Sequence, residues 1–485
     1  MTLSKLNVDT IVAQAKEALE KERGLSESFK AVFSLMIVLL ELMLSRLTKN
    51  SKNSSIPPSQ DPNRAKPKKD DTPKRKPGGQ PGRLAKVLQL IEEPDEVISV
   101  SVDRTTLPKG HTYRVVDHVK RQVVELIIKS HVKEYRLEVV EDETGKRYTA
   151  ETPEGASRPI QYGNSIKATS VYMNLYQMIP YARLQDFFLH QGDIPISEGS
   201  VFNFNKEAAS RLDAFEVIAK SHLEQASLLH TDETGINVSG KRIWLHNASN
   251  NEWVWLEPHE TRGTLAMDEI GILPNFRGVM VHDGWSSYFT YKDASHALCN
   301  AHHLRELQAA IEAKPTHTWA KEMKDLLLSV NDATIRAGGV LKEPEAQKYR
   351  QDYREIIAKG ELECPELLAL HLGPTSLGNK KKRGNKKVAQ TKERNLLQRL
   401  KLYELETLRF MTDIEVPFTN NRGENDIRMT KVQQKISGCF KTTQNAKIFC
   451  RIRSYLLTAQ KHGIHATDAL TTLFGGKLPD FCTVA

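Results

Sequence analysis

The sequence is poor in cysteine, with only five in 485 residues. Their number is odd, their spacing is irregular, and no two of them form a CxxC pair. These features argue against a disulfide framework and favour a reducing compartment, so we expect a cytoplasmic protein. The five cysteines are Cys299, Cys364, Cys439, Cys450 and Cys482.

Long apolar runs are also missing. The longest apolar stretch, Leu35–Leu44, contains Glu41 and is far shorter than the roughly 18 residues that a membrane span requires. The opening residues, MTLSKLNVDT, lack the apolar segment of a signal peptide. We therefore expect neither a membrane span nor a cleaved signal.

Charge, by contrast, is abundant and unbalanced. Lys and Arg number 69 against 60 Asp and Glu, which gives a formal net charge of +9. This excess points to a polyanionic partner such as nucleic acid. The hydrophobic share of 39% is that of a globular chain, and its length predicts about three domains.

The first 86 residues divide by composition. Residues 1–50 have apolar positions with partly heptad spacing and are expected to be helical, either as a coiled coil or as an intramolecular helix pair. Residues 51–86 are rich in Pro, Gly, Ser and Lys and form a predicted linker, whose basic side chains either follow DNA phosphates or only keep it solvated. These basic side chains are Lys66, Lys68, Lys69, Lys74, Arg75 and Lys76.

A β-like segment and a helical segment follow. Residues 87–160 alternate apolar and polar side chains, most clearly in Val97–Val102 and Arg121–Ile128, which predicts a small β-rich module. Residues 161–225 are expected to be helical, and the break QGDIP is typical of a helix-turn-helix, with ordinary helical packing as the alternative. The predicted helices are Ile166–Met178, Tyr181–His190 and Ser197–Ala209, the last capped by Ser197.

Two short apolar strands run into an acidic residue. Leu228–Gly235 (LLHTDETG) leads into Asp232, and Gly278–Trp285 (GVMVHDGW) leads into Asp283. Such an acid either belongs to an ordinary strand-end turn or is a metal ligand held by a rigid strand. If the two strands are neighbours in one sheet, their carboxylates lie close enough to share divalent cations, as in two-metal phosphoryl-transfer sites.

The order of elements around these acids supports that arrangement. Residues 226–312 are expected to form three consecutive strands, a helix, two more strands and a helix, which is the ribonuclease-H-like order. In it the first and fourth strands, the two acidic ones, lie side by side. Trp244, Trp253 and Trp255 alternate with polar residues and are interpreted as sheet packing. The predicted strands are Ser227–His230, Arg242–Asn247, Glu252–Glu257, Gly278–His282 and His296–Leu298, and the helices are Thr264–Ile272 and Asn300–Ala313.

A third acid is expected from the C-terminal part of the chain. Residues 417–430, PFTNNRGENDIRMT, predict the start of a helix that continues to Ile436, with Glu424 near its beginning. Asn421 and Glu424 have the spacing of a capping box, so a cap is the structural alternative to a third metal ligand.

A helical stretch separates Glu424 from the two acidic strands. Its run GNKKKRGNKKVAQTKER is either a solvated loop or an arm that follows DNA phosphates. The basic side chains assigned to DNA contact are Lys380, Lys381, Lys382, Arg383, Lys386 and Lys387. The predicted helices of this stretch are Trp319–Val330, Pro344–Lys359 and Lys392–Arg409, and Ala446–His462 is the last predicted helix of the chain.

Taken together, these motifs resemble those of the transposases of the insertion sequence 66 family, which carry a DDE triad. The resemblance covers most of the chain, and it implies that Asp232, Asp283 and Glu424 are the catalytic residues and the ligands of two Mg²⁺ or Mn²⁺ ions. The motifs that carry it are NSKNSSIPPSQDP, KPGGQPG, YGNSIKA, YQMIPYARL, HTDETG, VHDGW, CNAHHLREL, FTNNRGENDIR and CRIRSYLLTAQKHG.

The resemblance also implies the architecture, an α+β multidomain protein with a ribonuclease-H-like α/β catalytic core that is interrupted by a helical insertion. N-terminal coiled-coil or helical, small β-rich and helix-turn-helix-like parts precede the core. The predicted boundaries are 1–50, 51–86, 87–160, 161–225, 226–312 for the first part of the core, 313–412 for the insertion, 413–463 for the second part of the core, and 464–485 for a tail.

Family members further carry a CxxH motif after the second Asp, which here is Cys299 and His302 in CNAHH. We expect a structural or DNA-positioning role, because two ligands hold zinc only together with partners that the sequence does not reveal. Many relatives have paired zinc-ligand cysteines before the helical segment, whereas residues 87–160 contain none. Zinc is therefore not expected.

The activity implied by the resemblance is DNA transposition. The protein is expected to bind the double-stranded ends of its element, to cleave them with metal-activated water, and to join the 3′-OH ends to target DNA. A catalytically silent DNA-binding regulator and a nuclease that cuts without joining are the alternatives. We also expect a homodimer or higher oligomer, small accessory proteins of the same element, and a nucleoid-associated location.

Overall fold

The computed structural model describes residues 88–153, 155–366 and 390–482, together with scattered positions before residue 64. The chain divides into two compact units. Both predicted basic clusters, 66–76 and 380–387, and most of the predicted N-terminal helix lie outside the described residues. The first unit comprises Met1–Arg64, Tyr135–Asp186 and Ile196–Ala485, and the second comprises Ala65–Glu134 and Phe187–Pro195.

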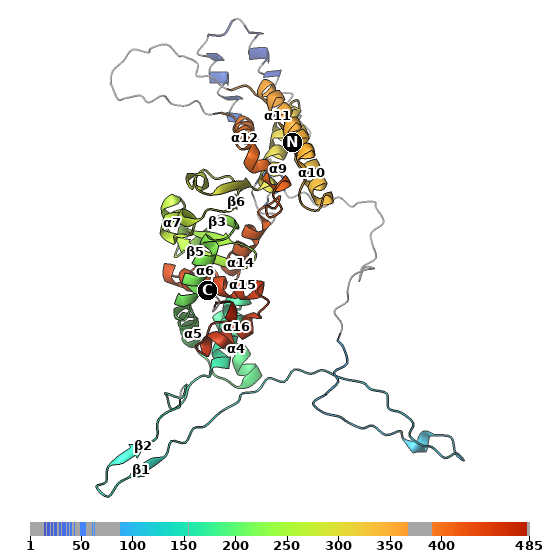
Figure 1. Cartoon of the computed structure of the whole chain (residues 1–485), viewed down its shortest axis with the longest axis vertical. Coiled ribbons are helices and arrows are strands. Elements are labelled where there is room, and N and C mark those ends of the chain that lie inside the picture. Colours follow the sequence, from blue (N-terminus) through green and yellow to red (C-terminus); the bar gives the residue numbers. More distant parts are fainter. Residues whose placement is uncertain are drawn as a thin grey trace. The chain divides into compact units, whose positions relative to one another are not determined.

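Five strands of the first unit form a mixed sheet in the order β5-β4-β3-β6-β7 (Figure 1). β3 pairs with β4, and β4 with β5, in antiparallel fashion, whereas β6 pairs in parallel with both β3 and β7. The predicted adjacency of the two acidic strands, β3 and β6, is therefore confirmed. The strands are β3 (Leu228–Val238), β4 (Lys241–Ser249), β5 (Val254–His259), β6 (Val279–His282) and β7 (Ser295–Leu298).

β3 is longer than the sequence predicted. It continues to Val238 because its second half pairs with β4 across a two-residue hairpin turn at Ser239 and Gly240. Both turn residues have positive φ, 50° and 82°, which is the backbone that such tight hairpins require. Asp232 consequently lies inside a strand, and the strand-end-turn interpretation is wrong for this residue.

Helices that precede the sheet in the sequence and helices that follow it both contact its strands. α14 (Asn421–Ser437) contacts β3 and β4, and α15 (Thr443–Lys461) contacts β5. The remaining helices before the sheet are α3 (Asn164–Val171) with its π-helical continuation η3 (Tyr172–Tyr176), α4 (Tyr181–Gly192), α5 (Glu198–Ser210) and α6 (Asp213–Glu224). Those after β5 are α7 (Thr264–Ile270), α8 (Ile272–Asn275), α9 (Asn300–Ala313) and α16 (Ala466–Phe474). None of the helices in the described ranges is long and apolar enough to cross a membrane.

The helices between α9 and α14 share one hydrophobic core with α9 and with part of the sheet. Trp319 is fully buried in this core and donates from Nε1 to the carboxylate of Glu393 at 2.8 Å. Val281 of β6 and Ala297 of β7 belong to the same core, so the sheet and these helices are packed together. The helices are α10 (Trp319–Arg336), α11 (Glu343–Glu363), α12 (Lys392–Leu402) and α13 (Glu404–Leu408).

Two of the three tryptophans interpreted as sheet packing are buried as expected, whereas Trp244 is half-buried beside Arg242 and Arg262, and the predicted helix cap also forms. Trp253 and Trp255 are buried, and both lie against Phe215 of α6. Ser197 accepts a hydrogen bond from the Ser200 N–H at 3.1 Å and caps α5. α6 and α16, by contrast, were not predicted as separate helices.

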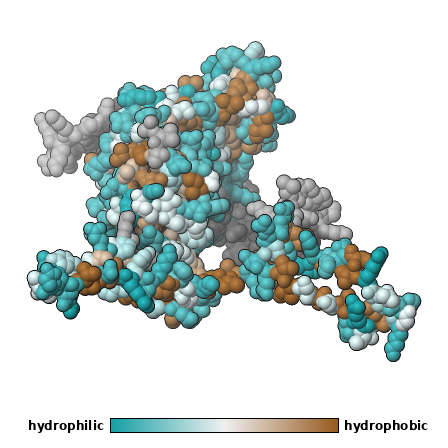
Figure 2. Space-filling view, turned by 60° about the horizontal axis from the view of Figure 1, so that its bottom comes forward, coloured by the Kyte–Doolittle hydropathy of each residue, from teal (hydrophilic) through white to brown (hydrophobic). Residues whose placement is uncertain are grey.

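The strands predicted at Val97–Val102 and Arg121–Ile128 are absent. Within the described part of the predicted β-rich module, the only strands are β1 (Val139–Glu141) and β2 (Arg147–Thr149), which form one antiparallel hairpin. Many apolar side chains between residues 88 and 140 are exposed, and Figure 2 shows apolar groups (brown) at the surface. Alternating apolar residues form a sheet only where another surface covers their apolar face, and the described residues supply none here.

Candidate active site

The parallel pairing of β3 with β6 places two acids at one level of the sheet. The last paired residues are His230 and Val281, and Asp232 and Asp283 each lie two positions further on. Because side chains two residues apart in a strand point to the same face, we infer that both carboxylates leave the same face of the sheet.

Asp232 is in an unfavourable electrostatic environment. Burial raises its pKa well above the ordinary value, and the negative charges of Glu233, Asp283 and Glu424 raise the pKa further. The backbone N–H of Glu233 donates to Asp232 at 2.9 Å and opposes this rise only in part. None of the ion pairs among the described residues involves Asp232 or Asp283. Asp232 and Asp283 thus repel each other without an ion pair of their own among the described residues.

The acid next to Asp232 behaves differently. The Glu233 side chain is 1% exposed, and it accepts hydrogen bonds from Arg262 Nε at 2.9 Å and from the Tyr288 hydroxyl. The Arg262 guanidinium in turn lies 4.1 Å from the centre of the Trp285 ring. Burial and the charge of Asp283 raise the pKa of Glu233 as well, but Glu233 has a cationic partner in Arg262, whereas Asp232 has no ion pair among the described residues.

Glu424 does not form the capping box that its spacing allowed. α14 begins at Asn421, its N-cap residue is Asn420, and no side chain caps its first turn. The Glu424 side chain is instead 39% exposed and lies on the α9 side of the site. Its Oε1 is 3.8 Å from Arg305 Nη2 and 4.0 Å from His302 Nδ1, both beyond hydrogen-bond reach.

Asn420 was missed by the sequence analysis and connects three elements. Its Oδ1 lies 2.8 Å from His230 Nδ1, and its Nδ2 donates to the Thr231 carbonyl at 2.8 Å, so it is bound twice to β3. Its backbone N–H donates to Cys299 Sγ at 3.1 Å, at the start of α9. These bonds hold the beginning of α14 beside the acidic strand. The doubled Asn in FTNNRGEN was the only signal in the sequence.

Cys299 and His302 lie on the same side of the site as Glu424. One ligand atom of each of these three residues lies within 4.8 Å of the other two. Among the described residues, no other three His, Cys, Asp or Glu side chains meet this criterion. Asp232, Asp283 and Glu424 are thus near enough to interact electrostatically, but their ligand atoms are not grouped as closely as this second set.

Two arginines place positive charge beside the acids. Arg305 comes from α9, and Arg399 comes from α12, where it forms an ion pair with Glu306. Burial lowers the pKa of Arg399, while the negative charge of Asp283 opposes that shift. Neither arginine was singled out from the sequence.

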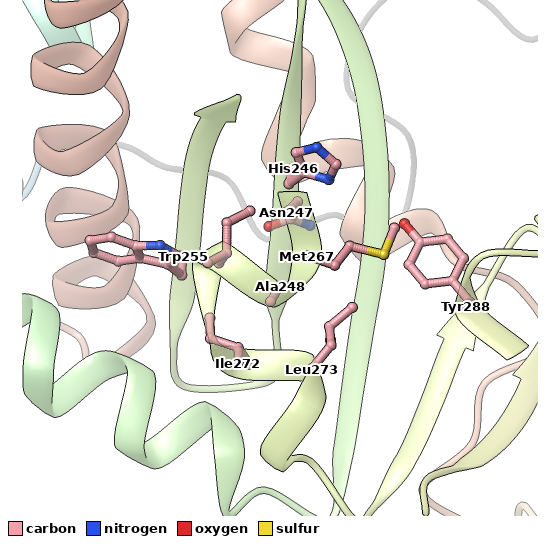
Figure 3. A pocket seen from close by; sticks show the side chains of 9 residues that line it. His246, Asn247, Ala248, Trp255, Met267, Ile272, Leu273 and Tyr288 are labelled. Atoms are coloured by element: carbon pink, nitrogen blue, oxygen red, sulfur yellow. The ribbon is translucent and has the colours of Figure 1, made fainter. Parts of the chain in front are cut away.

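A small pocket lies between the sheet and α7–α8 (Figure 3). None of Asp232, Asp283 or Glu424 lines it, so it is not the candidate site. Its lining residues are His246, Asn247, Ala248, Trp255, Met267, Ile270, Ile272, Leu273 and Tyr288.

The comparison with protein families covers this whole region. Residues 159–448, more than half of the chain, match the family described as the IS66 family of transposases. The match includes all five strands of the sheet, α9 and α14. No curated protein is significantly similar to the chain. By the family match, the chain belongs to the IS66 family of transposases.

Proposed function

We propose that this protein cleaves the ends of its element and joins them to target DNA, with Asp232, Asp283 and Glu424 as the ligands of two Mg²⁺ or Mn²⁺ ions. Membership of the family implies DNA transposition by a catalytic transposase. The individual steps and the residue roles are our proposal. The observation that supports it best is the contrast between Asp232, which lacks an ion pair among the described residues, and Glu233, which pairs with Arg262.

The residues fit a hard divalent cation. Carboxylate oxygens are the ligands that Mg²⁺ and Mn²⁺ prefer. Glu424 Oε1 is buried and has no hydrogen-bond partner among the described residues. Burial and, after it, repulsion by the neighbouring acids raise the pKa of Asp232, and a bound cation would offset both effects. When bound, such ions neutralise phosphate charge and activate the attacking water or 3′-OH.

The chain itself then has three tasks. The charges of Asp283 and Glu424 both act on Asp232, so Asp232 is near both acids, which suits a ligand shared by two ions. Asp283 and Glu424 would each hold one ion. Arg305 and Arg399, which lie beside the acids, would bind the phosphates of the DNA backbone, with which guanidinium groups form paired hydrogen bonds.

The test is Asp232→Asn in the full chain, assayed on a labelled double-stranded element end with Mg²⁺ or Mn²⁺. This change removes a ligand charge at nearly constant volume, so we expect metal-dependent cleavage to fall by at least about 100-fold. Asp426→Asn is the matched control, because Asp426 pairs with Lys461 at 3.4 Å and is not assigned to the site. Persistence of cleavage in Asp232→Asn refutes the proposal.

The same assay separates the alternatives. Products in which the 3′ ends are joined to target DNA support transposition. Cleavage without joined products indicates a nuclease, and binding of the element end without cleavage indicates a regulator.

A further inference from the structure

The beginnings of two helices, α9 and α14, are fixed against each other. The Asn300 N–H donates to the Phe418 carbonyl at 3.0 Å, and the Asn420 N–H donates to Cys299 Sγ at 3.1 Å. Asn300 Nδ2 also donates to the Thr407 carbonyl at 3.0 Å. Side chains on these two helix starts therefore meet on a firmly held backbone.

Three metal-ligating side chains meet at this junction. Cys299 is the N-cap residue of α9, and His302 is three positions later, which puts both on one side of the helix. Glu424 reaches them from the first turn of α14. Their ligand atoms all lie within 4.8 Å of one another, as stated above.

Two of the three ligand atoms lack a hydrogen-bond partner among the described residues, and the nearest cationic group is Arg305 Nη2, 3.8 Å from Glu424 Oε1. His302 Nδ1 and Glu424 Oε1 are both shielded from solvent, and neither has a hydrogen-bond partner among the described residues. They lie 4.0 Å apart, which is too long for a hydrogen bond between them. Because buried polar atoms are nearly always satisfied, two that face each other indicate an absent ligand between them.

We propose that Cys299, His302 and Glu424 bind one zinc-class divalent ion. Only the sharing of Glu424 with the carboxylate site rests on the proposed function. A thiolate and an imidazole favour zinc over Mg²⁺ or Ca²⁺, and three protein ligands leave a fourth position for water. Burial raises the pKa of the Cys299 thiol, and the hydrogen bond from the Asn420 N–H opposes this rise, so the bound ion would have to displace the thiol proton.

The ligand atoms lie within 4.8 Å of one another and would have to close by up to about 1 Å to bind this ion. Ligand atoms on one tetrahedral zinc are roughly 3.3–3.7 Å apart, given bonds of about 2.0–2.3 Å. The 4.0 Å between His302 and Glu424 must therefore close by a few tenths of an ångström. The Glu424 side chain is partly exposed, so it has room to make this movement.

Zinc at this site would keep Glu424 beside α9. Glu424 is also the proposed third ligand of the Mg²⁺ site, so zinc and the catalytic ions compete for one carboxylate. The expectation that zinc is absent rested on the lack of cysteine in residues 87–160 and, at this site, on only two visible ligands, beside which the fold places Glu424.

The test is titration of the reduced full chain with Co²⁺, a spectroscopic substitute for zinc. We expect one equivalent of Co²⁺ to produce a thiolate-to-cobalt charge-transfer band that zinc abolishes and excess Mg²⁺ does not. The band should be lost in Cys299→Ser and retained in Cys439→Ser, whose cysteine is exposed. Absence of the band from the unaltered protein, or its persistence in Cys299→Ser, overturns the proposal.

Two further measurements cover the case in which Cys299→Ser does not fold. X-ray absorption of the zinc-loaded, unaltered protein should show one sulfur ligand, and a sulfur-free shell overturns the site. Glu424→Gln should weaken Co²⁺ affinity at least about 10-fold, whereas Asp426→Asn, at a residue that pairs with Lys461, should leave it unchanged. Unchanged affinity in Glu424→Gln removes Glu424 from the site and refutes the proposal as stated.

The readouts keep this inference separate from the proposed function. A cobalt band without metal-dependent DNA cleavage supports the zinc site and refutes the cleavage proposal. Metal-dependent DNA cleavage without a cobalt band supports the cleavage proposal and refutes the zinc site.

Discussion

Asn420 is the residue on which the position of the α14 start depends most. Asn420→Ala removes the partners of His230 Nδ1 and of the Thr231 carbonyl, both in the buried interior. Leaving buried polar groups unsatisfied costs about 1–3 kcal/mol each, so we expect a loss of roughly 2–4 kcal/mol in the free energy of unfolding, measured by urea denaturation. Asn421→Ala, one position later and exposed, should change it by less than about 0.5 kcal/mol. Equal effects would contradict this role.

At the same scale, the sequence identified acids but not their surroundings. Asp232 and Asp283 could be chosen because each follows a short apolar run, and that pattern is local. The sequence could not predict that Glu233 has an ion-pair partner and Asp232 has none. The partner of Glu233, Arg262, is 29 residues away in the sequence. Asn420 was missed for the same reason, since its partners lie 121 to 190 residues away.

Among the elements, α15 protects the edge of the sheet. β5 is an edge strand, and two of its backbone N–H groups donate to helix hydroxyls, Val254 to Thr458 at 3.1 Å and Leu256 to Ser454 at 2.8 Å. The two N–H groups are two residues apart in the strand, and the two hydroxyls that accept from them are four residues, about one turn, apart in the helix. This pairing satisfies groups that would otherwise be a template for another strand.

A substitution in α15 tests this protection. Ser454→Ala leaves the Leu256 N–H buried without its partner, so we expect a loss of about 1–3 kcal/mol in the free energy of unfolding. Ser329→Ala, at an exposed position of α10, is the matched control and should be close to neutral. Thermal and urea unfolding measure both. A Ser454→Ala protein as stable as the control would show that this hydrogen bond does not secure the edge.

The order of elements was largely predictable, but their extent was not. β6 and β7 were found almost to the residue, because each is a short apolar run next to Gly, Asp or Cys. The predicted strand ended too early compared with β3, because the second half of β3, Glu233–Val238, is stabilised by pairing with β4 rather than by its own composition. Val97–Val102 has the alternation of a strand, yet no neighbouring strand in the described part of the chain pairs with it.

For the whole molecule, buried histidines make stability depend on pH. Burial lowers the pKa of His246 from 6.5 to about 4 and also lowers that of His296. Below pH 6.5 these histidines bind protons in the unfolded chain but not in the folded protein. Their contribution to stability therefore falls as the pH decreases from 6.5 toward 4. His246 alone should contribute about 1.4 kcal/mol per pH unit in this range.

Denaturation at a series of pH values from 7.5 to about 5 measures this slope. His246→Gln should flatten it by the contribution of one histidine, and His111→Gln, at an exposed position, should leave it unchanged. The raised pKa values of Asp232 and Glu233 act on stability in the opposite direction, so the contribution of His246 is the difference between the two slopes, and an unchanged slope in His246→Gln would contradict its buried, neutral state.

By itself, the sequence determined the order of strands and helices, the family, and which acids are candidates, because apolar periodicity, turn residues and short motifs are properties of neighbouring residues. Only the tertiary structure decided which acid has an ion-pair partner, what holds the start of α14, and which side chains meet Glu424. Those outcomes depend on groups that are distant in the chain and adjacent in space. The third ligand beside Cys299 and His302 is the clearest case, because Glu424 reaches it across more than 120 residues.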